Sequence, residues 1–253
     1  QVAMTNHHWK FSVNALREGL GVSHFLLLND FTALALSLIR LPESQKRQIG
    51  SGTATPNAAI GLIGPGTGLG VSGLFPVGYQ NKWIPIAGEG GHVSLTATTE
   101  HEFAAIQQLQ KRYGHVSAER VISGAGLVDL YHALCDLKDG QGREITTPAE
   151  VLERAQEVPT STANEALDMF CGFLGSVAGD LALTLGARGG IYIGGGIVPR
   201  LGERFDASPF RERFEAKGRF KKYLQDVPTW VIHSPVSPAL QGASQALSLT
   251  QWQ

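Results

Sequence analysis

The stretch AAIGLIGPGTGLGVSGLF (residues 58–75) decides the fold, because it joins two short apolar segments through a run of glycines. Short apolar runs that contain β-branched residues and end at glycines are typical of buried strands. We therefore predict two strands connected by the turn GPGTGLG (64–70).

This turn matches neither of the two common nucleotide-binding motifs. No Lys-Ser/Thr pair follows it, which excludes a P-loop, and Leu69 stands where the dinucleotide fingerprint needs a glycine. Its backbone N–H groups could still cradle one phosphate, and a tight hairpin without a ligand is the alternative. A second glycine turn, IGGGIVPR (193–200), has an ordinary strand-to-helix turn as its alternative. Two such turns in one chain favour contact with a phosphate or a nucleotide.

Apolar segments elsewhere alternate between strand-like and helix-like patterns, which predicts an α/β protein. HFLLLND (24–30) reads as a buried strand, and 189–193 as another. Two polar connections, 41–57 and 139–150, separate the elements. The predicted helices cover 31–39, 101–114, 126–137, a segment that begins at TPAE (147–150) with Thr147 as its cap and Pro148 first, 166–185, and 238–249.

Composition limits the function classes. The formal net charge is −1 over 253 residues, so nothing favours binding to nucleic acid or to an anionic membrane. Cys135 and Cys171 match no metal or redox spacing and read as reduced core residues. Polar residues interrupt the apolar stretches before spanning length, and no signal peptide opens the chain, so we expect a soluble intracellular protein.

Asp30 is the first candidate site residue, because it follows the predicted strand 24–30. Ligands of open α/β sheets gather at the carboxyl ends of strands. The alternative is that Asp30 only caps the helix predicted to begin at Phe31.

Three further candidates lie near glycines. Glu89 and His92 stand in IPIAGEGGHVSL (84–95), between two segments that read as buried, and a surface turn is their alternative. Glu119 stands in HVSAERVISG (115–124), where it could instead be an acidic residue in the first turn of a helix. Each signal is weak alone, but together they are more specific.

In combination, these segments resemble the bacterial ATP-dependent glucokinases of the actin-like hexokinase superfamily. The resemblance covers essentially the whole chain in order, and GEGGH and HVSAER are its most specific parts. The zinc-loop branch of related sugar kinases is disfavoured, because no cysteine lies between His92 and Cys135. The matching segments are TNHHW (5–9), LLLNDFTA (26–33), IGPGTGLGVS (63–72), PIAGEGGHVSL (85–95), GHVSAERVISGAGLVDLY (114–131), GGIYIGGGIVPR (189–200) and KGRFKKYLQDVPTWVI (217–232).

The resemblance implies a D-glucose site. Glu89, His92 and Glu119 would bind sugar hydroxyls, while Asn29 and Asp30 would hold the hydroxyl that reacts. Carboxylates accept strongly and imidazole can donate or accept, which suits a ligand rich in hydroxyl groups. Asp30 would also be the catalytic base.

The resemblance also implies an ATP site, with Mg²⁺ carried by the nucleotide and few protein ligands to the metal. It further implies a cytoplasmic homodimer. The residues expected to cradle the phosphates are Gly64, Gly66, Thr67 and Gly68, and those expected under the adenosine are Gly194, Gly195 and Gly196.

The implied architecture is an actin-like ATPase (ribonuclease H-like) fold of two α/β domains. Residues 1–40 with 238–253 would form a small, N-terminally incomplete domain, and 41–237 the large one. The family's first phosphate motif, Asp-x-Gly-Gly-Thr, occurs nowhere in the sequence. For the 253 residues alone we therefore expect poor solubility or partial disorder before about residue 40, and little activity. A non-catalytic sugar-sensing protein and an inactive truncated gene product are the alternatives to an active enzyme.

Overall fold

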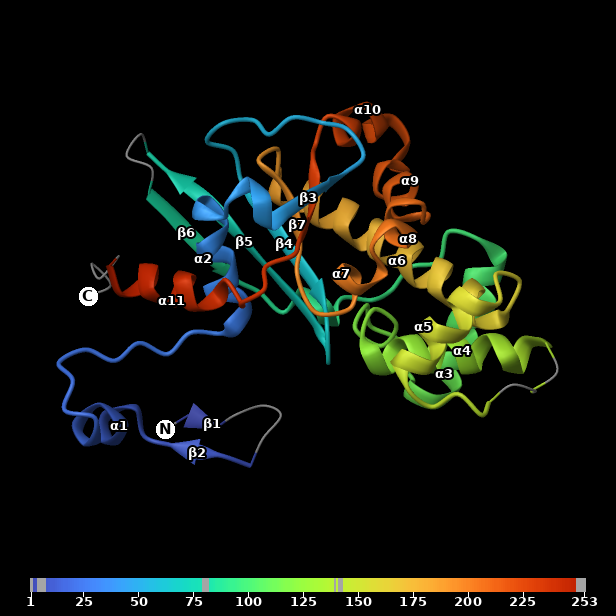
Figure 1. Ribbon diagram of the computed structural model, residues 1–253, viewed down its shortest axis with the longest axis horizontal. Coiled ribbons are helices and arrows are strands. Elements are labelled where there is room, and N and C mark those ends of the chain that lie inside the picture. The colour runs from blue at the N-terminus through green and yellow to red at the C-terminus, as the bar shows by residue number, and fades with distance from the viewer. Residues whose placement is uncertain (1, 4–7, 79–81, 139, 141–142, 249–253) are drawn as a thin grey trace.

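A computed structural model gives the structure of the chain and describes residues 2–3, 8–78, 82–138, 140 and 143–248 (Figure 1). Part of the TNHHW segment and the end of the last predicted helix lie outside these residues. Six strands of the described chain form one mixed sheet in the order β3-β8-β7-β4-β5-β6. Their bounds are Lys46–Ile49 (β3), Ile60–Pro65 (β4), Leu69–Val77 (β5), Lys82–Ala87 (β6), Gly190–Ile193 (β7) and Thr229–Ile232 (β8).

The predicted hairpin is confirmed as β4 and β5. They pair antiparallel, with Gly64 opposite Gly70 and Pro65 opposite Leu69, so that the glycine turn closes the hairpin. β4 also pairs parallel with β7, and β7 pairs parallel with β8. The carboxyl ends of β4 and β7 therefore lie side by side, which places both glycine turns at the same end of the sheet, next to the carboxyl ends of these central strands.

Helices cover both faces of this sheet, so the α/β prediction is confirmed. On one face the long helix α6 packs its apolar stripe, including Phe170 and Leu174, into a large core with Ile63. On the other face α2 and α11 pack against the strands in a second core that includes Leu36 and Leu62. The longer helices are α2 (Asp30–Ser37), α3 (Glu100–Tyr113), α4 (Gly124–Lys138), α5 (Pro148–Glu157), α6 (Thr162–Leu185) and α11 (Ala239–Ser248).

The remaining elements are short. β1 and β2 form a two-stranded antiparallel pair, and Figure 1 shows this pair and α1 lying apart from the central sheet. Four short α-helices and one 3₁₀ turn (Gly218–Phe220) lie between β7 and β8. The bounds are Val2–Ala3 (β1), Lys10–Phe11 (β2), Val13–Gly19 (α1), Val198–Leu201 (α7), Glu203–Asp206 (α8), Phe210–Glu215 (α9) and Lys221–Gln225 (α10).

Local signals fix the helix ends where the sequence predicted them. Thr147 caps α5 in a capping box with Glu150, and Pro148 is the first helical residue. Gly186 ends α6 in the left-handed conformation, with φ of 60°. α6 is long and apolar enough to cross a membrane. However, 72% of its apolar 18-residue stretch is buried inside the protein, as expected of a core helix.

The predicted strand 24–30 is wrong. Residues 24–29 form no strand, and Leu27 is 45% exposed. A strand needs a neighbour for its backbone groups, and none of the described strands pairs with this segment. Only the helix that follows is confirmed, and it begins at Asp30.

Two strands at the sheet edges were missed. The connection 41–57 contains β3, which pairs with β8 although its sequence KRQI is polar. IPIA (84–87) belongs to β6, at the opposite edge, where Ile84 is 46% exposed. The interpretation of this segment as buried is therefore wrong at Ile84, since an edge strand keeps one side open to solvent, whereas Leu95 in the segment after GEGGH is buried.

α2 and α11 contact each other closely. A Cβ on Gly242 of α11 would overlap the backbone carbonyl of Ala33 in α2, so only glycine permits this approach. Both helices belong to the small domain of the predicted division, and both pack on the central sheet. That division, at residues 40/41 and 237/238, stays a prediction.

Candidate functional site

The glycine turn between β4 and β5 forms a seat for Phe31. A Cβ on Gly64 would lie 2.6 Å from Cζ of Phe31, and a Cβ on Gly70 would overlap ring carbons of the same side chain. These two glycines are therefore explained by close approach of the ring. Gly66, at the turn, has open space beside it, since a Cβ there would meet nothing within 4 Å.

Glu119 connects this turn to the GEGGH segment. Its Oε2 accepts the backbone N–H of Leu69 at 2.9 Å, and its own backbone N–H donates to the Gly91 carbonyl at 2.8 Å. A Cβ on Gly68 would overlap Glu119 Oε2, so a side chain at this position would displace the carboxylate. Glu119 lies in a turn before α4, which excludes the alternative of a first-turn helical residue.

His92 lies in a short 3₁₀ turn, Gly90–His92, that contacts the glycine loop, and Glu89 immediately precedes this turn. A Cβ on Gly91 would overlap the Leu69 carbonyl, so the turn and the loop are in direct contact. The side chains of His92 and Glu89 are 62% and 85% exposed, with 3.9 Å between Nε2 and Oε2. Both groups are thus held loosely in solvent, where an approaching ligand can reach them.

Asn29 and Asp30 lie at the start of α2. Asn29 is the N-cap, and its Oδ1 accepts from the Phe31 N–H at 2.9 Å and from the Thr32 N–H at 3.3 Å. Asp30 is the first helical residue, and its Oδ1 also accepts from the Phe31 N–H, at 2.9 Å. The N-cap of α2 is therefore Asn29, and the alternative in which Asp30 only caps this helix is wrong.

The second glycine turn packs on the first. The Gly194 N–H donates to the Ile63 carbonyl at 2.8 Å, and Gly195 has φ of 79°, where a Cβ would overlap the Pro65 carbonyl. Close beside this turn is a cavity of about 410 Å³. Its lining residues are Leu34, Gly194, Gly195, Gly196, Pro199, Arg200, Ile232, His233, Ser234, Ser237 and Pro238.

Sequence reasoning missed the polar residues of this cavity. Arg200 lies in α7, four residues after Gly196, while His233, Ser234 and Ser237 follow β8. β8 pairs parallel with β7, so the carboxyl ends of both strands lie at the same end of the sheet. Recognising TWVI (229–232) as a parallel strand was the signal that could have located these residues.

The structure therefore brings the predicted site residues to one region around the β4–β5 turn. Glu119 and the Glu89–His92 turn contact it through Leu69, while Asn29 and Asp30 are joined to it through Phe31. The second glycine turn contacts it at Pro65. Such a region can present carboxylates to a polyol and backbone N–H groups to a phosphate.

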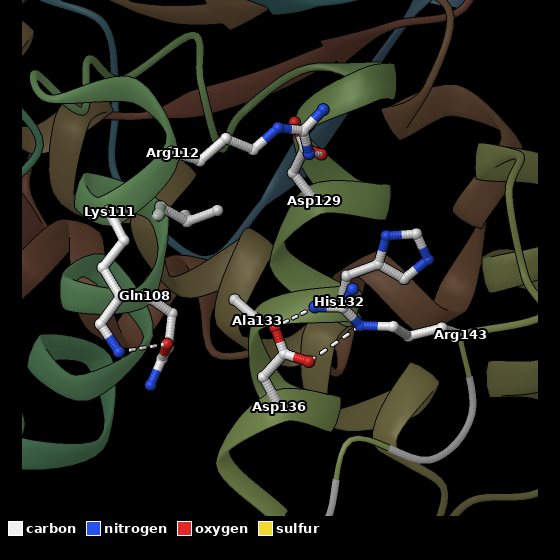
Figure 2. Close-up of a pocket in the computed structure, with 9 residues that line it drawn as sticks. Gln108, Lys111, Arg112, Asp129, His132, Ala133, Asp136 and Arg143 are labelled. Carbon is white, nitrogen blue, oxygen red and sulfur yellow. Dashed lines mark hydrogen bonds and ion pairs between the residues drawn. The ribbon is translucent and has the colours of Figure 1, made fainter.

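Another cavity, of about 390 Å³, lies between α3 and α4 (Figure 2). None of the predicted site residues lines it. Its charges are largely paired within the wall, since Arg112 bonds Asp129 and Arg143 bonds Asp136. These ion pairs leave little uncompensated charge to attract a ligand.

The chain is similar to known proteins along nearly its whole length. A family model described as Glucokinase matches residues 1–250. A glucokinase of Chromobacterium violaceum is 53% identical over 247 residues, which are 98% of this chain and 70% of that protein. The bifunctional protein glk of Paraburkholderia xenovorans is 50% identical over 248 residues, and the chain spans only 38% of its length.

Solved structures agree with this similarity. The crystal structure of a glucokinase from an Antarctic psychrotroph has a TM-score of 0.86 and 35% identity, covering 95% of this chain and 74% of that one. A ROK family glucokinase from Streptomyces griseus, solved with glucose and AMPPNP, has a TM-score of 0.60 and 18% identity, covering 92% and 71%. The predicted actin-like fold is thereby confirmed.

Proposed function

The chain belongs to the glucokinase family, and on this premise we propose that it transfers the γ-phosphoryl group of ATP to the 6-hydroxyl of D-glucose. The products are glucose 6-phosphate and ADP. The observation that carries the proposal is the gathering of Asp30, Glu119 and the Glu89–His92 turn around one glycine hairpin. A polyol and a phosphate chain are the two ligands that this combination suits.

Glucose is held by hydroxyl contacts to Glu89, His92, Glu119 and Asn29. Each ionised carboxylate accepts two or more hydrogen bonds, so a sugar with the wrong stereochemistry leaves strong acceptors unpaired. Glu119 also accepts a hydrogen bond from Leu69, so a residue that binds the sugar contacts the loop that faces ATP.

Asp30 accepts the proton of the 6-hydroxyl as that oxygen attacks phosphorus. The bond from the hydroxyl oxygen to the γ-phosphorus forms, the bond to the bridging oxygen breaks, and ADP leaves with the electron pair. Such transfer depends mainly on in-line placement and charge neutralisation. The side chain of Asp30 is exposed, so the carboxylate is accessible to a bound sugar.

ATP lies across the two glycine turns. Gly64, Gly66, Thr67 and Gly68 face the phosphates, and the cavity beside Gly194, Gly195 and Gly196 takes the nucleoside. Its volume, about 410 Å³, falls within the usual range of small-molecule pockets. Closure of the site over both ligands excludes water, which otherwise competes with the sugar as phosphoryl acceptor.

Magnesium would be bound together with ATP, where it would supply charge neutralisation at the phosphates. Within the described residues, no three His, Cys, Asp or Glu side chains gather as a metal site. Mg²⁺ commonly takes one or two carboxylates and completes its shell with phosphate oxygens and water, and on this ground we propose an ion carried by the nucleotide.

We further propose that the enzyme is cytoplasmic and that it forms a homodimer. Its small domain comprises residues 1–40 and 238–253, and its large domain residues 41–237. The family membership supports these three statements.

A coupled assay with the full-length gene product, ATP and glucose tests the proposed function. We expect ATP-dependent formation of glucose 6-phosphate, identified by its oxidation with a dehydrogenase specific for that product. Glucose binding without turnover, measured by calorimetry in the same preparation, would identify a sugar-sensing protein instead. The absence of both glucose binding and turnover would identify an inactive gene product.

A further inference from the structure

The Phe31 ring contacts Gly64 and Gly70 of the β4–β5 turn, and Gly64 lies against the second glycine turn. The ring occupies the space that side chains at Gly64 and Gly70 would need, directly at the base of the β4–β5 turn. Gly64 in turn contacts the second glycine turn, since a Cβ there would lie 2.8 Å from the Gly194 carbonyl carbon and 3.0 Å from the Gly195 nitrogen. The ring is therefore a wedge at the junction of both turns.

The backbone of the same residue holds the two groups proposed to bind the reacting hydroxyl. The single N–H of Phe31 donates to Asn29 Oδ1 and to Asp30 Oδ1, both at 2.9 Å. The Asn29 and Asp30 side chains are otherwise exposed, so this shared donor is a principal restraint on both. A shift of Phe31 would move them together.

We propose that Phe31 is a positioning residue, which sets the placement of the Asp30 carboxylate relative to the phosphate-facing turn. This inference rests on the proposed function. The ring fixes the start of α2 to the hairpin, and the N–H fixes the carboxylate to the start of α2. Gly64 and Gly70 are then required because they admit the ring, a role separate from any contact with ATP.

The kinetic consequence follows from the nature of the reaction. A displacement of about 1 Å between reacting groups can lower turnover by on the order of 10²-fold. Ground-state binding tolerates such a shift better, because the exposed Glu89 and His92 side chains can readjust their hydrogen bonds to the sugar. Loss of the wedge should therefore lower kcat much more than it raises KM for either substrate.

Three variants of the full-length protein test this role. Phe31→Ala removes the wedge, and we expect kcat to fall by roughly 10- to 100-fold while KM for glucose and ATP changes by about threefold or less. Gly70→Ala should lower kcat similarly, because its Cβ overlaps the ring carbons. In Phe31→Ala/Gly70→Ala the Cβ enters vacated space, so kcat should be no lower than in Phe31→Ala alone.

Matched controls separate positioning from general damage. Phe75 lies exposed on β5, the strand that carries Gly70, and Phe75→Ala should leave kcat unchanged. Gly19 has nothing within 4 Å of an added Cβ, and Gly19→Ala should do likewise. Because Phe31 also packs against the second core, Phe31→Leu retains most of the apolar volume and should fold while still losing turnover.

Two results would overturn the inference. One is a Phe31→Ala or Phe31→Leu protein that keeps wild-type kcat. The other is Gly70→Ala lowering kcat by the same factor with and without the ring, since the glycine would then act independently of Phe31. A wild-type protein without kinase activity would instead overturn the proposed function, and the inference with it.

Discussion

The carboxylate of Glu119 accepts a hydrogen bond from the backbone N–H of Leu69 at 2.9 Å, so a residue predicted to bind the sugar is bonded directly to the glycine turn. The same residue holds the Gly91 carbonyl through its backbone N–H at 2.8 Å. Three segments that lie far apart in the sequence thus meet at one residue. A change at this position should affect both the sugar and the loop.

We expect Glu119→Gln and Glu119→Ala to differ. The glutamine can still accept the Leu69 N–H through its amide oxygen, so it should mainly weaken glucose binding. The loss of one contact to a charged group costs about 1.5–3 kcal/mol, or roughly 10- to 150-fold in affinity. The alanine removes the loop contact as well and should also lower kcat. Steady-state kinetics with varied glucose and ATP measure both effects, and identical kinetic constants in the two variants would contradict the dual role.

Glu89→Gln and His92→Ala should weaken glucose binding far more than ATP binding. Both side chains are exposed and lie 3.9 Å apart, and the proposal assigns both to sugar hydroxyls. Each lost contact should cost roughly 1.5–3 kcal/mol once the site is closed and dry. Calorimetry with glucose and with a non-hydrolysable ATP analogue gives the two affinities. Equal weakening of both ligands would show that the turn is merely structural.

The buried pair of Glu102 and Arg213 links α3 to α9, and breaking it should destabilise the protein. Glu102 bonds Arg213 and accepts from the Thr98 N–H at 2.7 Å, and Arg213 also donates to Ser176 Oγ at 2.9 Å. Glu102→Gln leaves the guanidinium buried without its counter-ion, at a cost of about 3 kcal/mol in the free energy of unfolding. Asp226→Asn, which breaks an exposed pair with Lys222, is the control and should cost less than about 1 kcal/mol.

The contribution of Glu102 should depend on pH. Burial alone would raise its pKa, but hydrogen bonds from Arg213 and Thr98 outweigh burial and hold the pKa below the ordinary 4.5. A lowered folded-state pKa gives stability that is present above pH 4.5 and is lost as the pH falls through the folded value. Urea unfolding at several pH values should show the difference between wild type and Glu102→Gln shrinking in that acid range. A constant difference would contradict the assignment.

Local patterns in the sequence predicted the elements that carry a local signal, such as helical periodicity, a cap or a glycine turn. Helical periodicity located α3, α4 and α6, and the cap at Thr147 located the start of α5. The β4–β5 hairpin was also predictable, because its strands adjoin in sequence and its turn is marked by glycines.

Features that depend on distant partners could not be predicted in this way. HFLLLND (24–30) has a strand-like composition, but no described strand pairs with it. β3 is polar and becomes a strand only because β8 lies beside it. The seat for Phe31 is of the same kind, since nothing in GPGTGLG reveals that a ring from another segment occupies the space above Gly64 and Gly70.

Asp30 carries the central claim, because the proposal assigns to it the removal of the proton from the attacking hydroxyl. Asp30→Asn keeps the shape of the side chain and an oxygen that can accept the Phe31 N–H, but removes the base. The fall in kcat should then reflect chemistry rather than a displaced helix. Asp226→Asn is the matched control for a lost exposed carboxylate and should retain full turnover.

The decisive measurement is kcat for glucose phosphorylation by Asp30→Asn in the full-length protein, with glucose affinity determined in the same preparation. The account predicts a fall in kcat of on the order of 10²-fold or more while glucose still binds. A kcat close to that of the wild type would contradict it and would remove Asp30 from the catalytic role.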